Sequence, residues 1–550
     1  MTYFSYLFEA KGIQRYILDS GRLADEIGAS DLISELCQSS GSDLLDDVLQ
    51  SLSMRTNVAR RAAGSFCILD KDSERLEDAR ALWRLAVGAK LPGLEFSDCP
   101  PAAALDEVSA VAAARKAMIP LRENSSAFLL PSGHPFVAFA ARTGRIAVTK
   151  PSRTEEEKEE SDLVNAPQKR RGKLLGRGGD MDRLALSFAP NEPGTRFLFP
   201  RHFEETEASL KNPCFPFVGN DRRVAVVHAD ISGLGEIYAR VQRVAGSAED
   251  LFNISTKIEE AVISAARNAS TAVLATHAMR EKDGRSFWRL FNYPKAQNGT
   301  DFSRTAVLPA RPILLGGDDI TIIARADVAL TFAAKLLDEI ERRTREAFAS
   351  VDPKYGLTEL TACAGIAVVP AGHPTSAAST MADGLCKLAK ATAKAQKPYR
   401  SALGFAVVTS TIAEGYDLYR ERELRTQDGV FLNHDAYFVS GPFDVGTSFG
   451  SIVDLALALS EVPGRGKLYE TLGLRFDESP KAADRWERFW SYLEIEDCNA
   501  ANKLRTALAG CLQKGVGSGS IPPLDTALPF LGDALELIDI GAVRVLRGIV

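Results

Sequence analysis

Short apolar runs alternate with amphipathic stretches along the first 412 residues, a pattern typical of strands and helices in turn. It is clearest after residue 221. The elements predicted there are a strand (224–230), a helical stretch (235–267), a β-hairpin (about 306–325), a helix (326–348), a strand (357–370), a helix (376–396) and a strand (403–408). The order βα-ββ-αβ is that of a ferredoxin-like palm.

The first hundred residues repeat this order in a less regular form. The elements predicted there are a strand (3–8), a helical stretch (to 52), strands (56–61 and 66–70), a helix (73–87) and a short strand (91–96). Laid over the later unit, the repeat aligns Glu9 with Asp230, Gly12 with Gly233, and residues 63–66 with residues 316–319. A repeat of this length indicates two copies of one fold.

Two other regions interrupt or follow the repeats. Residues 100–221 are irregular, and their charged runs 154–160 and 169–173 indicate mobile surface segments more than binding sites. Residues 415–550 are mostly helical. The predicted fold class is therefore α+β, with two ferredoxin-like palms in tandem and a helical C-terminal domain. The predicted domains are a degenerate first palm (1–100), an irregular insert (101–221), a second palm (222–414) and the helical domain (415–550).

Composition limits the environment and the partners. The net charge of −6 gives no general attraction to nucleic acid, so any such contact must come from local patches or partner subunits. Eight cysteines without a Cys-x-x-Cys pair indicate buried thiols of a reducing compartment. The first residues lack the basic segment and cleavage site of a signal peptide, and no apolar stretch reaches the ~18 residues of a membrane span. We expect a cytoplasmic protein without membrane contact.

The candidate chemistry centres on Gly316-Gly317-Asp318-Asp319, at the tip of the predicted hairpin. Such a tetrapeptide alone is more often a surface turn. Here the preceding strand ends in Asp230, so three carboxylates are expected to converge where strands end. Their repulsion requires a cation, and an all-oxygen ligand set suits Mg²⁺ or Mn²⁺, which in turn hold nucleotide phosphates.

Glycines next to these carboxylates would let the backbone approach a triphosphate. Gly316 and Gly317 lack a Cβ and can adopt positive φ. Gly233 and Gly235 stand at the start of a predicted helix, whose amide groups bind phosphate well. Glycines at a helix start also serve packing alone, and the sequence leaves both interpretations open.

Lysines on the last helix of the second palm are further candidates. Lys387 and Lys390 could hold the γ-phosphate, although a solvated helix face explains Lys387 equally well. His434-Asp435 would suit a metal-dependent phosphohydrolase, but too few other histidines support that interpretation.

These motifs carry a resemblance to a known family. Residues 8–17 and 23–36 resemble the first palm of the large polymerase/cyclase subunit of type III CRISPR effector complexes. His228–Gly235, the Gly-Gly-Asp-Asp hairpin and Leu388-Ala-Lys390 are similar to that family's second palm. The resemblance implies two facing palms that hold two ATP molecules and join them into cyclic oligoadenylate.

The resemblance also implies ligands and partners. Asp230, Asp318 and Asp319 would bind two Mg²⁺ or Mn²⁺ ions, with the Ile231 carbonyl as a further ligand. In the mechanism that we expect from this, the first palm positions the acceptor nucleotide through Gly64 and Ser65. Guide-RNA effector subunits and target RNA would be partners.

Three departures from the family pattern stand out. The His-Asp nuclease domain is not expected, the insert lacks zinc-binding cysteines, and Ser232, a candidate nucleotide contact, replaces a second Asp. The reduced size also allows a stand-alone signalling enzyme, a monomer or a small oligomer.

Two other functions remain open at this stage. The chain could be a scaffold of an RNA-guided complex with weak or no cyclase activity, although three converging carboxylates argue against a silent site. It could also be a GTP-using enzyme of the diguanylate-cyclase type. The tandem palms argue against that, because those enzymes pair palms from two chains.

Overall fold

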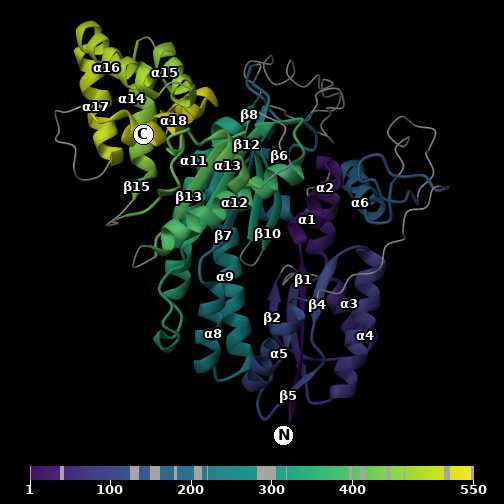
Figure 1. Cartoon of the computed structure of the whole chain (residues 1–550). Helices are drawn as coiled ribbons and strands as arrows, with labels where there is room; N and C mark the ends of the chain where they lie inside the picture. Colours follow the sequence, from purple (N-terminus) through teal and green to yellow (C-terminus); the bar gives the residue numbers. More distant parts are fainter. Residues whose placement is uncertain are drawn as a thin grey trace.

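The computed structural model of the chain describes residues 2–37, 43–62, 64–123, 136–148, 161–178, 182–203, 213–219, 221–280, 305–316, 319–395, 399–408, 415–441, 446–463, 465–477, 479–512 and 521–546. The first palm lies at one end of the molecule, the second palm in the middle and the C-terminal helices at the other end (Figure 1). The fold class expected from the sequence is confirmed.

The first palm is a five-stranded sheet covered by helices. Its strands run in the order β2-β3-β1-β4, and β5 pairs with β1. Its elements are β1 (Tyr3–Lys11), α1 (Ile13–Leu18), α2 (Leu23–Ser34), α3 (Leu44–Ser51), β2 (Asn57–Ala62), β3 (Ser65–Asp70), α4 (Ser73–Lys90), β4 (Glu95–Asp98), β5 (Ala102–Ala104) and α5 (Glu107–Leu121). The predicted boundary at residue 100 falls too early, because β5 joins this sheet and Ser5 Oγ donates a hydrogen bond to the Ala110 carbonyl of α5 (2.7 Å).

The second palm is built on a seven-stranded sheet in the order β10-β11-β7-β12-β13-β14-β15. Its elements are β7 (Arg223–Ile231), α8 (Leu234–Val244), α9 (Ala248–Ala269), the π-helix η2 (Ser270–Leu274), β10 (Ala310–Gly316), β11 (Asp319–Arg325), α11 (Ala326–Phe348), the 3₁₀-helix η4 (Pro353–Tyr355), β12 (Ala362–Pro370), α12 (Thr375–Lys394), β13 (Ala402–Val407), β14 (Tyr437–Phe438) and β15 (Thr447–Ser448). The short strands β14 and β15 extend this sheet beyond the predicted boundary at residue 414.

The central strands of the two palms correspond in position. The order β2-β3-β1-β4 in the first sheet matches β10-β11-β7-β12 in the second. In each palm a glycine with positive φ, Gly12 (56°) or Gly233 (70°), turns the central strand into the first helix. Positive φ is accessible to glycine at little steric cost, so both positions suit that residue. The structure thus supports the internal repeat that the sequence predicts.

The register shifts the predicted hairpin alignment by one residue. Glu9 pairs with Ser65 in the first palm as Asp230 pairs with Asp319 in the second. Ser65 therefore corresponds to Asp319, whereas the sequence overlay placed Phe66 there. The two-residue turn fixes this register, because Ala62 pairs with Ser65 as Gly316 pairs with Asp319.

The insert between the palms is more ordered than predicted. Its described elements are α6 (Asn165–Gly178), α7 (Arg183–Phe188) and β6 (Arg196–Leu198). Strand β6 forms a three-stranded sheet, in the order β6-β9-β8, with two later strands, β8 (Met279–Arg280) and β9 (Thr305–Val307). The basic run 169–173, expected to be mobile, lies in α6, which packs on α2. A Cβ on Gly172 would lie 2.2 Å from the Ala24 carbonyl oxygen, so the two helices approach too closely for any side chain there. The predicted charged run 154–160 lies outside the described residues.

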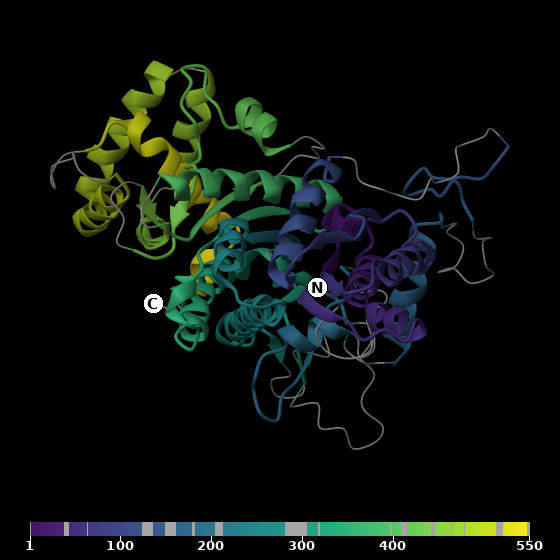
Figure 2. The same cartoon turned by 90° about the horizontal axis from the view of Figure 1, so that it is seen from below.

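The C-terminal domain is helical, as predicted. Its helices are α13 (Tyr416–Glu423), α14 (Phe449–Glu461), α15 (Gly466–Asp477), α16 (Ser479–Glu496), α17 (Cys498–Leu512), α18 (Leu524–Asp539) and α19 (Ala542–Leu546). Seen from below, most of this domain stands apart from the first palm, with the second palm between them (Figure 2). Among the described helices, none is long and apolar enough to cross a membrane.

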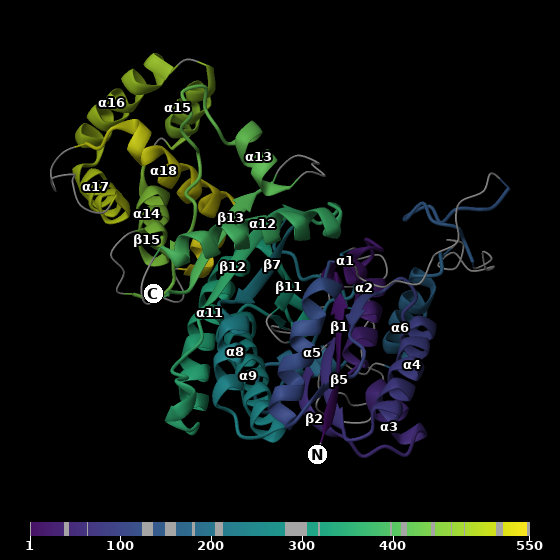
Figure 3. The ribbon, with the colours of Figure 1, turned by 60° about the horizontal axis from the view of Figure 1, so that its bottom comes forward.

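The two palms pack directly against each other. Helix α5 of the first palm lies beside α8 and α9 of the second (Figure 3), and Arg115 Nη1 donates to Gln242 Oε1 (3.0 Å) across this boundary. On the other side of the interface, Gln14 Nε2 lies 2.9 Å from His228 Nδ1. The buried Glu26 carboxyl group accepts a hydrogen bond from Thr375 there. The central strands of both palms are therefore held in a fixed relation.

Candidate functional site

The end of β7 and the start of β11 bring two predicted site residues together. Asp230 and Asp319 are register partners in the antiparallel pair β7–β11. Side chains that face each other across such a pair have Cβ atoms ~4.5–5.5 Å apart, on one face of the sheet. Gly316 is the next partner outward, opposite Asp319 on β10. Gly317 and Asp318 lie outside the described residues.

Asp230 is neutralised by a lysine from the helix above it. Lys390 on α12 forms an ion pair with Asp230 Oδ2, and both side chains are about a quarter exposed, at 28% and 24%. Burial lowers the pKa of Lys390, but the hydrogen bond and the charge of Asp230 outweigh that effect and raise it above its ordinary value. The ammonium group is therefore firmly protonated at neutral pH, and it occupies the position where a cation would contact this carboxylate.

Lys387, the second predicted lysine, points elsewhere. Its side chain is 73% exposed and pairs with Asp383 one turn earlier (2.6 Å). The structure thus favours the solvated helix face, which the sequence left as an equal alternative. The two lysines lie three residues apart on one helix, and only Lys390 reaches the carboxylates.

The helix α12 can lie close to these strands because β12 carries a glycine beneath it. A Cβ on Gly365 would lie 1.9 Å from the Ala382 carbonyl oxygen and 2.4 Å from the Cys386 amide nitrogen. Gly365 pairs with His228 on β7, so this contact brings α12 down over His228 and Asp230. The close approach is what allows Lys390 to reach Asp230.

The segment after β7 forms the other side of the site. Ile231 ends the strand opposite Ala362, and the Ser232 amide donates to the Thr361 carbonyl (2.8 Å). Ser232 Oγ lies 3.7 Å from Cys363 Sγ. Gly233 follows with φ of 70° and begins α8, and open space surrounds the Cβ positions of Gly233 and Gly235. The first amides of α8 therefore start beside free space, as phosphate binding at a helix N-terminus requires.

Sequence reasoning missed the histidine that joins the two palms next to this site. His228 lies two residues before Asp230, so both side chains share one face of β7. Burial lowers the pKa of His228 to about 4, against the opposing effect of Asp383, and the imidazole is neutral at pH 7. Gln14 of the first palm lies at hydrogen-bond distance from it. A polar residue inside an apolar strand was the signal available in the sequence.

The first palm holds the counterpart of this site without a second carboxylate. Glu9 stands opposite Ser65, and Arg122, the residue after α5, donates to both Glu9 oxygens at 2.8 and 3.0 Å. Burial raises the pKa of Glu9. The hydrogen bond and charge of Arg122 and the charge of Lys11 lower it by more, so the pKa ends below its ordinary value. Arg122 thus neutralises Glu9 in the first palm, as Lys390 neutralises Asp230 in the second.

The two first-palm residues predicted to contact nucleotide have different surroundings. Gly64 has φ of 77°, and a Cβ there would lie 2.7 Å from Ile13 Cδ1, so packing and backbone conformation both account for this glycine. Ser65 Oγ is buried and has no hydrogen-bond partner among the described residues.

The donor chemistry fits a hard divalent cation. Two carboxylates face each other, and like charges this close repel by ~3 kcal/mol at an effective dielectric constant of 20. A cation already sits against Asp230 as the Lys390 ammonium. The described residues, which exclude Asp318, contain no group of three His, Cys, Asp or Glu side chains placed to hold a metal. A complete ligand set would thus need Asp318 or the substrate phosphates.

The family model "Cas10/Cmr2, second palm domain" matches residues 223–397, from the first residue of β7 to just beyond α12. These residues are a Cas10/Cmr2 second palm domain. The match confirms the resemblance drawn from the hairpin and from His228–Gly235. Within this Cas10/Cmr2 palm lie Asp230, Asp319 and Lys390.

Solved structures similar to the whole chain are known as well. The apo Csm1-Csm4 cassette is 14% identical, with a TM-score of 0.45, over 98% of this chain and 70% of that one. The Csm1-Csm4 cassette in complex with cA4 is 13% identical, with a TM-score of 0.43 and the same coverage. Csm1 of T.onnurineus is 14% identical, with a TM-score of 0.45, over 98% of this chain and 69% of that one. No curated protein matches the chain.

Proposed function

We propose that the second palm is a metal-dependent nucleotidyltransferase that joins ATP into oligoadenylate, including cyclic forms, as a signalling molecule. We further propose that the chain works as the large subunit of a type III CRISPR effector complex in antiviral defence, with guide-RNA subunits as partners. One observation carries the enzymatic proposal: Asp230 and Asp319 face each other in a Cas10/Cmr2 palm.

Asp230, Asp318, Asp319 and the Ile231 carbonyl would hold two Mg²⁺ or Mn²⁺ ions. When bound, these ions promote loss of a proton from the acceptor ribose hydroxyl and stabilise the charge on the departing pyrophosphate. The hydroxyl oxygen forms a bond to the α-phosphorus of the donor, and the bond from that phosphorus to the pyrophosphate breaks. Each round releases one pyrophosphate and one proton.

The protein groups around the carboxylates would position the triphosphate. Gly316 and Gly317 let the chain turn close to the phosphates, and the first amides of α8, after Ser232 and Gly233, face the open space beside them. Lys390 would exchange its carboxylate partner for a phosphate oxygen once metal neutralises Asp230. Exact positioning and charge neutralisation supply most of the catalysis in this class of reaction.

The first palm would hold the acceptor nucleotide without metal. Glu9 is already neutralised by Arg122, so this half has no need for a cation. The predicted contacts Gly64 and Ser65 stand at the same strand end, and the buried Ser65 hydroxyl has no hydrogen-bond partner among the described residues.

The test is turnover by the purified chain, alone and with effector subunits and target RNA. Each NTP is incubated with Mg²⁺ or Mn²⁺, and products are resolved by mass together with pyrophosphate release. We expect an oligoadenylate product, and we expect Asp230→Asn and Asp319→Asn each to reduce the rate at least ~10³-fold. Asp338→Asn, which removes an exposed carboxylate of α11, is the matched control and should retain full activity. Unchanged turnover in Asp319→Asn would refute the assignment of the site. A product made only from GTP would replace the ATP proposal by the diguanylate-cyclase alternative.

A further inference from the structure

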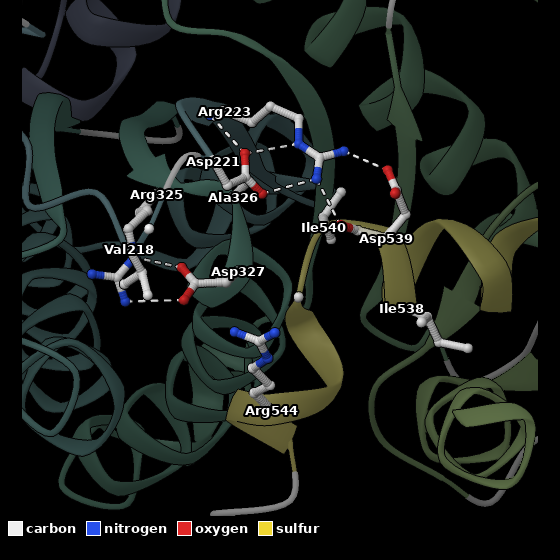
Figure 4. Close-up of a pocket in the computed structure, with 12 residues that line it drawn as sticks. Val218, Asp221, Arg223, Arg325, Ala326, Asp327, Ile538, Asp539, Ile540 and Arg544 are labelled. Atoms are coloured by element: carbon white, nitrogen blue, oxygen red, sulfur yellow. Dashed lines mark hydrogen bonds and ion pairs between the residues drawn. The ribbon is translucent and has the colours of Figure 1, made fainter. Parts of the chain in front are cut away.

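A cavity lies where the second palm meets the C-terminal domain. It has a volume of about 520 Å³ and is walled by the segment before β7, the end of β11 with the start of α11, and the end of α18 with α19 (Figure 4). Sites for small molecules in proteins commonly have volumes of ~300–1,000 Å³. The lining contains three arginines and three aspartates, so its net charge is zero when all are ionised.

Two of the arginines are fully engaged by the three aspartates. Arg223 bridges Asp221, through bonds of 3.0 and 2.8 Å, and Asp539, whose carboxylate and carbonyl oxygens lie at 2.5 and 2.6 Å. Arg325 donates to both oxygens of Asp327, at 2.6 and 3.0 Å. These bonds hold the walls of the cavity in place and tie the palm to α18.

The third arginine has no such partner. The guanidinium of Arg544 on α19 projects toward the space between Asp327 and Ile540 (Figure 4). Its side chain has no hydrogen-bond or ion-pair partner in the part of the chain that the structure describes. Because the other two arginines take all three carboxylates, Arg544 is the one arginine of this lining without a direct ion-pair partner among the described residues.

We propose that this cavity binds a small organic molecule with one anionic group, a phosphate monoester or a carboxylate, on a body rich in hydroxyl groups. The planar guanidinium of Arg544 matches either oxyanion through two parallel hydrogen bonds. The carboxylates of Asp327 and Asp539 retain lone pairs that accept hydrogen bonds from hydroxyl groups. A triphosphate is disfavoured, because three carboxylates line the cavity and would repel its additional charges.

This cavity is separate from the carboxylate pair of the second palm. Arg223 begins β7 and Arg325 ends β11, whereas Asp230 and Asp319 lie at the other ends of the same two strands. At ~3.3 Å per residue the two sites are ~20 Å apart. Binding here therefore does not depend on the proposed nucleotidyl transfer.

The test measures binding to the full chain by isothermal titration calorimetry. The probes are ribose 5-phosphate, AMP and gluconate, with ribose and adenosine as neutral counterparts. All titrations use the Asp230→Asn/Asp319→Asn protein in EDTA, so that the proposed catalytic site does not contribute. We expect at least one anionic probe to bind and its neutral counterpart to bind at least tenfold more weakly.

Variants assign the binding to Arg544. Arg544→Ala should weaken it at least tenfold and Arg544→Lys should restore part of it, whereas the exposed Arg243→Ala on α8 should have no effect. Binding of phosphates alone or of gluconate alone identifies the anionic group. The proposal is overturned if no probe binds at millimolar concentration, if neutral probes bind as well, or if Arg544→Ala binds normally.

Discussion

Removing the Lys390 charge gives the most direct test of the electrostatics at the carboxylate pair. The change Lys390→Met keeps the aliphatic stem of the side chain and deletes the ammonium that contacts Asp230. Asp230 is then left facing Asp319, its register partner. The native state of the variant should lose stability when metal is absent.

The magnitude follows from the geometry. Two carboxylates ~5 Å apart repel by ~3 kcal/mol at an effective dielectric constant of 20. This repulsion is present in both proteins and cancels in the comparison. The variant loses the attraction of the ammonium for Asp230, which is ~4 kcal/mol at the same dielectric constant before water screens part of it, since both side chains are about a quarter exposed. We therefore expect the free energy of unfolding to fall by ~2 kcal/mol at pH 7.

The pH dependence has a definite sign. The folded-state pKa of Lys390 is raised, so its stabilising contribution is complete below the unfolded value of ~10.4 and is lost as pH rises through the higher folded value. Between pH 7 and 9 the difference between wild type and variant should therefore stay constant.

Urea unfolding in EDTA and in Mg²⁺ measures both effects. Mg²⁺ should raise the stability of Lys390→Met more than that of the wild type, because the ion takes the place of the ammonium. The matched control is Lys387→Met, on the same helix but 73% exposed, which should change stability by less than ~0.5 kcal/mol. If Lys390→Met proves as stable as wild type in EDTA, the electrostatic account of this site is wrong.

Three further predictions concern packing and the palm interface. Gly365→Ala should push α12 away from β12, which we expect to lower the free energy of unfolding by ~2–4 kcal/mol and to weaken nucleotide binding. Unfolding in urea and binding titration measure these two effects. An unchanged stability would contradict the close contact. Gly172→Ala should destabilise the α2–α6 contact by a similar amount in thermal unfolding, whereas Gly473→Ala, in open space on α15, should stabilise the protein slightly. Burial raises the pKa of Glu26 to about 8, so wild-type stability should fall as pH rises from the unfolded pKa of ~4.3 through 8. Glu26→Gln should therefore be more stable than wild type at pH 9 and nearly equal to it at pH 4, and parallel pH profiles of the two proteins would count against this reasoning.

The sequence by itself determined the order of strands and helices in the second palm and which carboxylates to consider as a pair. Strands that carry continuous apolar runs, such as β7, are buried on both faces, and their hydrophobic pattern shows directly where they lie. The carboxylates Asp230 and Asp319 could be recognised as a pair because both stand at strand ends, where polar residues interrupt apolar runs. Turn chemistry placed the hairpin between 316 and 319, and the same reasoning indicated a second copy of the fold around Glu9.

Only the tertiary structure decided which side chains meet. The register between two strands cannot be predicted from the sequence of either strand alone. In the first palm it pairs Ser65 with Glu9, so Ser65 corresponds to Asp319, whereas the sequence overlay had placed Phe66 there. Lys387 and Lys390 look alike in sequence, but the approach of α12 over Gly365 lets only Lys390 reach Asp230. The sequence predicted a mobile surface segment at the charged run 169–173, whereas in the structure this run lies in α6, and Gly172 allows α6 to pack closely against α2. In each case the deciding contact joins residues far apart in the chain, and such contacts depend on packing that local composition does not encode.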